Sequence, residues 1–504
     1  MPQYLLGVDN GSTLIKAALF DLGGNEIAVH SSPVEVRTPA PGRFERSLED
    51  IWRANVEVIR KVVEKAGADP GDILGLAFTG HGGGVHLLDD RGEGLYPAME
   101  GVDTRARGCI ERWMTDGTFE RVHPKTLQNY FPAQMAPLLA WMKENEPGVL
   151  AKARWVLPLK DYVRFRLTGE AWGEITNMSA SGFLNVRDVR YDAGVLEELG
   201  LGGLEQKLPP LRLSADVCGK VTREAARLTG LKEGTPVAGG MWDVDASAIA
   251  TGVTDDTCLN IIAGTWCNNQ FVSSVPLVSK SLFMTTVFSI PGFWLVLEGS
   301  PTSASNLEWF VKELMGAERS RSERDGVAVY ELCNREVAST TAEEPVPVFL
   351  PFLYGSNAGP DALAAFVGLN GQHRRAHLLR SVYEGIVFSH RTHLEKLKAL
   401  RPLPDRARLA GGAAASEVWV QMFADALQLS IERIGAKELG ALGCAITAGV
   451  ACGAFASYRE GVRAMVHPTG RVDPDPSRAE TYGRKYRRYR AAIDSLSGFW
   501  KVPC

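Results

Sequence analysis

Two segments far apart in the chain share one design, and this repeat constrains the fold more than any other feature of the sequence. The segment "YLLGVDNGSTLIKAALF" begins with an apolar run, reaches a D-N-G turn and returns with a second apolar run. Residues 257 to 274, "TCLNIIAGTWCNNQFVSS", follow the same plan around a Gly-Thr turn. Apolar runs bounded by small-residue turns predict antiparallel hairpins. The chain is therefore predicted to have two halves of similar architecture, although no fixed-period repeat is visible.

The length of the chain and the periodicity between the hairpins predict an α/β protein of two domains. At 504 residues the chain is too long for one hydrophobic core. Residues 48 to 66 place apolar side chains on one face at helical spacing, and such helices alternate with strands. The segment "TGVTDD" is predicted to join the halves, which gives domains at residues 1–252 and 253–504.

Composition and charge favour a small molecule as the ligand. A net charge of −4 gives no general attraction to nucleic acid or to an anionic membrane. The eight cysteines include no C-x-x-C pair, so reduced thiols are expected, and no apolar run approaches the roughly 20 residues that span a bilayer. We therefore expect a cytoplasmic protein. The basic segment "TYGRKYRRYRAAI" has one apolar helical face and predicts a docked C-terminal helix.

Three small-residue turns are candidates for holding phosphate or nucleotide. In "DNGSTLIK" the turn at Gly11 brings backbone N–H groups together with the side chains of Ser12, Thr13 and Lys16, and Asp9 offers a carboxylate to hydrated Mg²⁺. The turn at Gly264 and Thr265 occupies the matching place in the other half. The third turn, at Gly411 and Gly412, fits either a nucleotide or tight strand-to-helix packing, and the residues alone leave both interpretations open.

Motifs of other enzyme classes are absent from the sequence. There is no complete G-x-x-x-x-G-K-[ST], no G-x-G-x-x-G after a strand, and no G-x-S-x-G. A P-loop ATPase, a Rossmann dehydrogenase and a serine hydrolase are therefore disfavoured.

Two carboxylates follow a Gly-Gly turn in "VAGGMWDVDASAIATG", residues 237 to 252. Asp243 and Asp245 fall at the start of a predicted helix, whose dipole favours negative charge. A helix turns by about 100° per residue, so the two side chains face about 200° apart and cannot both address one hydroxyl. One is predicted to do chemistry and the other to be a structural or surface carboxylate. Trp242 is predicted either to stack on a sugar or to be a buried structural residue.

Several segments together resemble the FGGY family of carbohydrate kinases, which share the actin-like, ribonuclease H-like (ASKHA) fold. They occur in family order from residue 7 to residue 449 and include "GVDNGSTLIKA", "VDTRA", "PVAGGMWD", "AGTW", "NLEWF" and "GGAAASEVWVQMFADAL". The segments "SPTSASNLEWF" and "FLPFLYGSNAG" are similar to those of L-xylulose kinases, with erythritol kinases as a near alternative. The resemblance implies a two-domain α/β fold with a central nucleotide cleft and with sugar bound mainly by the first domain.

The resemblance also implies roles for individual residues. Asp9 would act through Mg²⁺ in a first phosphate loop, and Asp243, which follows Pro236 at the family's spacing, would be the catalytic base beside the metal. Counting back from Gly252 would select Asp245 instead. The remaining nucleotide-binding residues implied are Gly11, Ser12, Thr13, Gly264, Thr265, Ala304, Leu307, Glu308, Gly411, Gly412 and Ala413.

One departure from the family concerns the sugar site. Where related kinases carry side chains that grip the sugar, this chain has Gly82 and Gly83. Glycines offer only backbone groups and space, so selectivity is expected from His81, Asp103 and Arg105 nearby.

The resulting prediction is an ATP- and Mg²⁺-dependent kinase of L-xylulose or a related pentulose. A polyol kinase of the erythritol or glycerol type is the alternative, and a non-catalytic nucleotide-binding sensor is the alternative of another class. A homodimer is compatible with the sequence.

Overall fold

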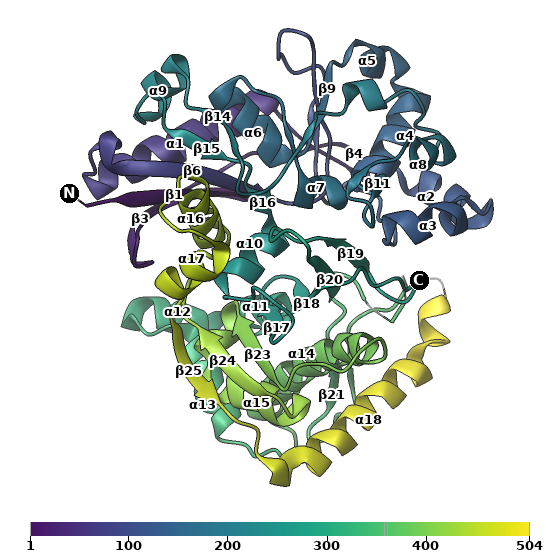
Figure 1. Ribbon diagram of the computed structural model, residues 1–504. Coiled ribbons are helices and arrows are strands. Elements are labelled where there is room, and N and C mark those ends of the chain that lie inside the picture. Colours follow the sequence, from purple (N-terminus) through teal and green to yellow (C-terminus); the bar gives the residue numbers. More distant parts are fainter. Residues whose placement is uncertain (1, 357, 360, 503–504) are drawn as a thin grey trace. The chain divides into compact units, whose positions relative to one another are not determined.

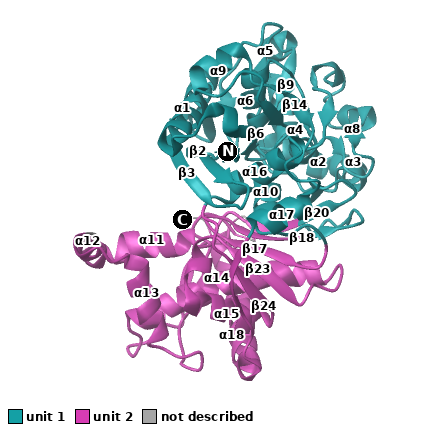
Figure 2. Cartoon of the chain, turned by 60° about the vertical axis from the view of Figure 1, so that its left-hand side comes forward, with its two compact units in different colours: residues 1–255, 272–296, 438–466 teal, residues 256–271, 297–437, 467–504 magenta. Residues whose placement is uncertain are grey.

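The protein divides into two compact units, each built around a β-sheet (Figure 1, Figure 2). The computed structural model describes residues 2–356, 358–359 and 361–502. Unit 1 consists of Met1–Asp255, Val272–Val296 and Glu438–Val466, and unit 2 of Asp256–Phe271, Leu297–Lys437 and His467–Cys504. Unit 1 therefore includes two segments from the second half of the chain, Val272–Val296 and Glu438–Val466. The assignment of sugar binding to residues 1–252 and of nucleotide binding to residues 253–504 stays a prediction.

The sheet of unit 1 begins with the predicted meander. The antiparallel strands are β1 (Tyr4–Asn10), β2 (Leu14–Asp21) and β3 (Glu26–Pro33). On the other side of β1 lie two parallel strands and an antiparallel edge strand: β6 (Ile73–Gly80), β15 (Pro236–Ala238) and β14 (Val217–Lys220). The short strand β16 (Met241–Trp242) also pairs with β6 and leads into the helix that carries Asp243.

The sheet of unit 2 repeats this order. The hairpin predicted at residues 257 to 274 is present as β17 (Leu259–Ala263) and β18 (Cys267–Ser273), with β20 (Trp294–Ser300) beside β18. Two parallel strands and an antiparallel edge strand follow: β23 (Arg406–Ala410), β24 (Ser430–Ile434) and β25 (Pro468–Val472). The predicted repeat of architecture is therefore confirmed in the order of these strands and in the directions of the pairs from β18 to β25.

Helices α1 (Leu48–Ala66) and α16 (Leu439–Ala451) are two of the helices that pack on the sheet of unit 1. Helix α1, predicted from its periodicity, buries its apolar face in the same core as Leu6 and Val8 of β1. Side chains alternate along a strand, so Gly7 faces the opposite way. There α16 lies beside β1 and β6 (Figure 1), so close that a Cβ on Gly7 would overlap the backbone of Ala441. The small residues of "ALGCAITAG" permit this approach.

The other helices build the surroundings of the sites. In unit 1 they include α2 (Arg107–Thr115), α3 (Thr118–Thr126), α4 (Met135–Asn145), α6 (Leu159–Thr168), α7 (Ile175–Ser179) and α10 (Asp243–Ala250). In unit 2 they include α11 (Ser305–Leu314), α13 (Val329–Ala338), α14 (Arg375–Lys398), α15 (Glu417–Leu427) and α18 (Ala479–Leu496). Helix α18 buries Tyr482, Tyr486, Tyr489 and Ile493, which confirms the predicted docked helix.

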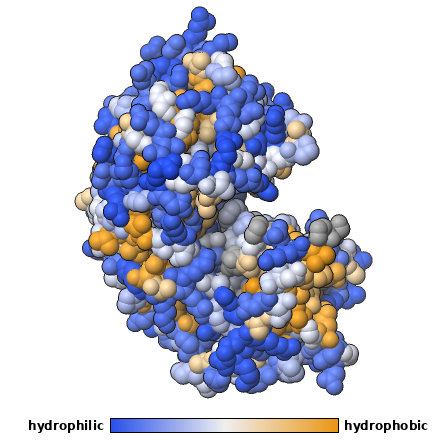
Figure 3. Space-filling model, turned by 90° about the vertical axis from the view of Figure 1, so that its right-hand side faces the viewer, coloured by the Kyte–Doolittle hydropathy of each residue, from blue (hydrophilic) through white to orange (hydrophobic). Residues whose placement is uncertain are grey.

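The surface is mixed in character. On the face drawn in Figure 3, hydrophilic residues predominate and hydrophobic residues gather in separate groups. Within the described part of the chain, no helix has both the length and the apolar character needed to span a bilayer. The seven cysteines that the structure describes are free.

Candidate active site

Asp243 is the first residue of α10, and the backbone in front of it is tightly constrained. Gly240 has a φ of 78°, and a Cβ there would overlap the carbonyl oxygen of Phe78 in β6. The chain then forms β16, in which Trp242 is paired with Gly80, and enters the helix directly. Asp243 is half-buried and lies at the positive end of the helix dipole. Thus the Gly-Gly turn fixes where the helix begins, as the sequence predicted.

The carboxylate of Asp9 acts on the pKa of Asp243 within unit 1. Burial, and then the negative charge of Asp9, raise the pKa of Asp243 to about 7. Burial also raises the pKa of Asp9 to about 6; Lys16 opposes this shift and Glu438 adds to it. A Cβ on Gly440, at the start of α16, would lie 2.5 Å from Oδ2 of Asp9, so only glycine leaves room for this carboxylate. Two half-buried carboxylates, of which one raises the pKa of the other, are suited to binding a cation.

Asp245 points elsewhere. It is fully buried, and its Oδ1 accepts a hydrogen bond of 3.0 Å from the main-chain N–H of Ser289. Burial, and then the charge of Glu174, raise the pKa of Asp245 well above its ordinary value. Of the two roles predicted for the second carboxylate, the structural one is therefore observed, and it is a buried position rather than a surface one.

The first predicted phosphate loop is a tight hairpin turn between β1 and β2. Gly11 donates its N–H to the carbonyl of Leu14 at 3.1 Å, and the turn leaves Ser12 half-buried and Thr13 exposed. Arg46 is fully buried and donates to the carbonyl of Gly11 at 3.2 Å. Lys16 is engaged in an ion pair of 3.0 Å with Glu438, so in this structure its charge faces a carboxylate.

The residues proposed to select the sugar fall into two groups. His81 lies 3.4 Å from Glu100, whose carboxylate also pairs with Arg46 at 2.6 Å. A Cβ on Gly82 would lie 2.5 Å from Nε1 of the Trp242 indole. Hence the room left by this glycine is taken up by the indole, and the expectation that Gly82 offers free space is corrected. Gly83 is equally crowded, because its Cβ would lie 2.9 Å from the Cα of Gly101.

Asp103 and Arg105 form the second group. Their polar atoms form hydrogen bonds and ion pairs with other residues of the protein. Asp103 is buried and accepts from the main-chain N–H groups of Phe44 and Arg105. The Arg105 guanidinium pairs with Asp103 and with Glu45, both at 2.8 Å. These contacts give the pair a structural task, and a direct contact with substrate stays a prediction for both residues.

Of the two roles that the sequence left open for Trp242, the buried position is observed, and stacking on a sugar stays a prediction. Its side chain is buried, and Nε1 has no hydrogen-bond partner among the described residues. Buried polar groups are usually paired, so this indole N–H is a candidate to donate to a bound hydroxyl.

Unit 2 contains a cavity of about 620 Å³. Six of the predicted nucleotide-binding residues line it: Gly264, Thr265, Ala304, Leu307, Glu308 and Gly412. The turn and the helix are held together, because the main-chain N–H of Ala304 donates to the carbonyl of Gly264 at 2.8 Å. The volume lies in the range of sites for small ligands and cofactors.

Two residues of the third predicted turn do not line this cavity. Gly411 shapes the turn instead, with a φ of 88° and with its Cβ position 2.6 Å from the carbonyl oxygen of Ala263. Ala413 is fully buried. Tight strand-to-helix packing, one of the two interpretations of this turn, therefore describes Gly411 and Ala413. Gly412 lines the cavity instead.

Comparisons with known proteins agree on one family. The N-terminal domain of the FGGY family of carbohydrate kinases matches residues 4–250, and the C-terminal domain matches residues 259–452. The chain belongs to the FGGY family of carbohydrate kinases. The predicted family, fold class and enzyme class are thereby confirmed: this FGGY kinase has the family's two-domain α/β fold and takes ATP as phosphoryl donor.

Individual relatives span almost the whole chain. The L-xylulose/3-keto-L-gulonate kinase of Escherichia coli K12 is 36% identical over 99% of this chain and 98% of its own length. A probable L-xylulose kinase of Pasteurella multocida is also 36% identical, over 98% of this chain and 99% of its own. The crystal structure of a xylulose kinase from Rhodospirillum rubrum has a TM-score of 0.89 at 27% identity and covers 99% of this chain and 100% of that one.

Most of the residues that line the cavity of this FGGY kinase were not predicted from the sequence. Tyr330 and Asn334 come from α13, Tyr383 from α14 and Trp419 from α15, and Ser416 immediately precedes α15. Tyr383 and Trp419 stack with ring centroids 4.2 Å apart. The one available signal was Ser416, whose position before a helical run predicts an N-cap, and its side chain does accept from the N–H of Trp419. The aromatic pair depends on how two helices pack.

Proposed function

We propose that this FGGY kinase transfers the γ-phosphoryl group of ATP to a hydroxyl of L-xylulose or a related pentulose. The substrate is inferred from the two relatives that match nearly the full chain, whose names refer to L-xylulose. The observation that carries the proposed mechanism is the carboxylate pair of Asp9 and Asp243, with Asp243 at the start of α10 and Asp245 committed to the core.

Asp243 is proposed as the base. The acceptor hydroxyl oxygen forms a bond to the γ-phosphorus while its proton passes to the Asp243 carboxylate, and the bond from the γ-phosphorus to the bridging oxygen of ADP breaks. Such transfers require positioning and charge neutralisation more than a strong base.

Asp9 and Asp243 are proposed to hold Mg²⁺ with water and phosphate oxygens. The residues fit this ion because both are oxygen donors and because Mg²⁺ is usually bound through one or two carboxylates. When bound, the ion neutralises charge on the transferring phosphoryl group. The hydroxyls of Ser12 and Thr13 and the backbone at Gly11 are proposed to receive phosphate in unit 1.

The cavity of unit 2 is proposed to hold the nucleotide. Gly264 and Thr265 form a small-residue turn beside the N-terminus of α11, an arrangement that suits phosphate. The stacked Tyr383 and Trp419 give the cavity an aromatic wall. On the sugar side, His81 and the unpaired Nε1 of Trp242 are the groups proposed to contact substrate hydroxyls. The cytoplasmic location, the homodimer and the exclusion of nucleic acid stay predictions.

A coupled assay of ADP release tests the substrate. The purified enzyme is supplied with ATP, Mg²⁺ and, one at a time, L-xylulose, other pentuloses, 3-keto-L-gulonate, pentitols, erythritol and glycerol. The highest kcat/KM is expected for L-xylulose or another pentulose. A much higher value for erythritol or glycerol would make the protein a polyol kinase. If no compound stimulated ADP release, the non-catalytic sensor would be favoured instead.

A further inference from the structure

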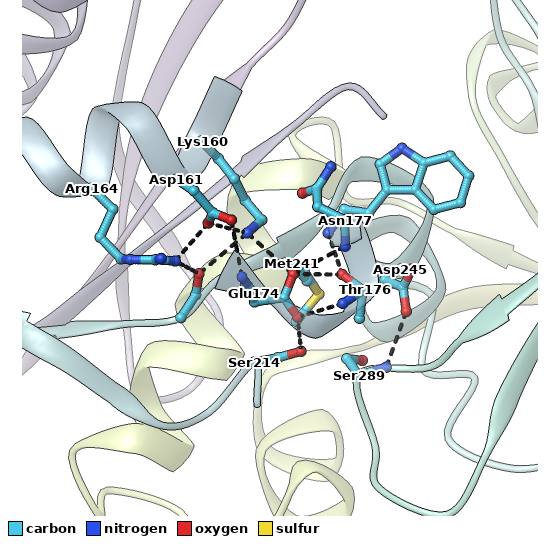
Figure 4. A network of polar contacts seen from close by, with 12 residues as sticks. Lys160, Asp161, Arg164, Glu174, Thr176, Asn177, Ser214, Met241, Asp245 and Ser289 are labelled. Carbon is cyan, nitrogen blue, oxygen red and sulfur yellow. Dashed lines mark hydrogen bonds and ion pairs between the residues drawn. The ribbon is translucent and has the colours of Figure 1, made fainter. Parts of the chain in front are cut away.

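Four charged side chains are buried together in unit 1, away from solvent and in balanced numbers. Lys160, Asp161 and Arg164 come from α6, and Glu174 immediately precedes α7. Lys160 pairs with Asp161 at 2.6 Å and with Glu174 at 3.1 Å, and Arg164 pairs with Asp161 at 2.7 Å (Figure 4). Each side chain is at most 1% exposed. Burying charges is costly even when they are paired, so a network of this size calls for an explanation beyond stability.

The network continues through Thr176 to the residue in front of Asp243. The Thr176 hydroxyl donates to Oε2 of Glu174 at 2.8 Å and accepts the main-chain N–H of Trp242 at 2.7 Å. A hydroxyl has a single hydrogen, and an ionised carboxylate can only accept. Because Glu174 takes that hydrogen, a lone pair of Thr176 is left to face Trp242. The main-chain N–H of Trp242 can only donate, so the Thr176 hydroxyl satisfies this amide and Glu174 at the same time.

The same network holds the other end of this short segment. The carbonyl of Gly239 accepts from Arg164 at 2.6 Å and from Lys160 at 3.4 Å. Gly239 and Trp242 bracket the turn and the strand β16, and Asp243 follows at once. Both ends of the segment that delivers Asp243 are therefore tied to one set of buried charges.

We propose that Thr176 is a positioning residue for Asp243. Its hydroxyl links the buried charges around Glu174 to the main chain of Trp242 and thereby fixes the backbone position of the adjacent Asp243. The inference rests on the proposed role of Asp243 and adds a fully buried residue that acts through its hydrogen bonds. Displacements of about 1 Å from a productive geometry can lower a rate about 100-fold, so a bond to the residue next to the base is enough to affect turnover.

The test compares two substitutions at Thr176 in the full-length enzyme, with the sugar found in the substrate screen. Thr176→Val keeps the shape and removes the hydroxyl, and is expected to lower kcat about 10- to 100-fold while changing the KM for ATP less than about twofold. Thr176→Ser restores the hydroxyl and is expected to restore kcat. Equal losses in both variants would overturn the inference, because they would show that packing of the methyl group matters and not the hydrogen bond. If Thr176→Val does not fold, Thr176→Ala takes its place.

A second arm asks whether the effect acts through Asp243. In an Asp243→Asn background, Thr176→Val should lower the remaining rate by less than about twofold, because its target is already removed. The same factor in both backgrounds would overturn the inference. Ser214→Ala is the matched control: this hydroxyl donates to Oε1 of Glu174 at 2.6 Å, whereas the bond to the main chain of Trp242 is made by Thr176, so kcat should change far less. Full activity of Asp243→Asn alone would instead refute the proposed base, whatever Thr176 does.

Discussion

Asp245 accepts a hydrogen bond of 3.0 Å from the main-chain N–H of Ser289, and this bond separates the roles of the two carboxylates of α10. Burial, and then the charge of Glu174, raise its pKa well above the ordinary value, so the site favours the neutral form of this side chain. An asparagine has the same shape and the same accepting oxygen. Asp245→Asn is therefore expected to change kcat by less than about threefold in a steady-state assay of ADP release.

Asp243→Asn removes the proposed base while keeping its size. We expect kcat to fall by about 10²- to 10⁴-fold, the usual contribution of a positioned base. ADP binding, measured by calorimetry, should stay nearly unchanged, because the cavity belongs to unit 2. A kcat close to that of the parent enzyme would remove Asp243 from the catalytic role, and a comparable loss in Asp245→Asn would mean that both substitutions act through the structure of α10.

Local signals in the sequence predicted much of the fold. The D-N-G and Gly-Thr turns located both hairpins, and the spacing of apolar residues located α1 and α18. The Gly-Gly turn placed Asp243 at a helix start, because the lengths of a strand and a turn determine where the next helix begins. These features depend only on neighbouring residues.

Features that depend on distant packing were not predictable in this way. No local pattern indicates that Ser289 lies against Asp245, or that Thr176 lies against Trp242. The crowding of Gly82 by an indole from another strand is of the same kind, since the glycine alone suggested empty space. The small residues of α16 were a usable signal for a close approach to a sheet, but they did not say to which strand.

Gly82→Ala should disturb the sugar site through Trp242. The new Cβ would lie 2.5 Å from Nε1 of the indole, so the ring must shift. We expect a KM for the sugar at least about fivefold higher, a change of roughly 1 kcal/mol, with the KM for ATP nearly constant. Gly108→Ala is the control, because Gly108 lies in α2 and a Cβ there meets nothing within 4 Å. Unchanged sugar kinetics in Gly82→Ala would show that Trp242 has no part in sugar binding.

Gly412→Leu should block the nucleotide cavity without harming the fold. A Cβ on Gly412 meets nothing within 4 Å, and the residue lines the cavity of unit 2. The larger side chain is expected to weaken ADP binding at least about tenfold, or roughly 1.4 kcal/mol, in calorimetric titration. Gly371→Leu, at another open position of the same unit, should bind ADP like the parent enzyme. Equal affinity in the two variants would place the nucleotide elsewhere.

The buried ion pair of Glu100 predicts a pH dependence of stability. Burial alone would raise the pKa of Glu100, but the hydrogen bond to His81 and the charges of His81 and Arg46 outweigh it and lower the pKa from 4.5 to about 2. A carboxyl whose pKa is lower in the folded state than in the unfolded state stabilises the fold above its unfolded pKa. This contribution is lost as the pH falls through the folded pKa.

The measurement compares the parent enzyme with Glu100→Gln. Near neutral pH the variant should be less stable by on the order of 3 kcal/mol, because the depressed pKa corresponds to that much stabilisation and because Arg46 loses its partner. As the pH is lowered from about 6 to about 3, the difference between the thermal midpoints of the two proteins should shrink, since the parent's Glu100 becomes protonated in the unfolded state. A difference that stayed constant over this range would mean that Glu100 does not ionise with a depressed pKa, and that its contact with Arg46 stabilises the fold by shape and hydrogen bonding alone.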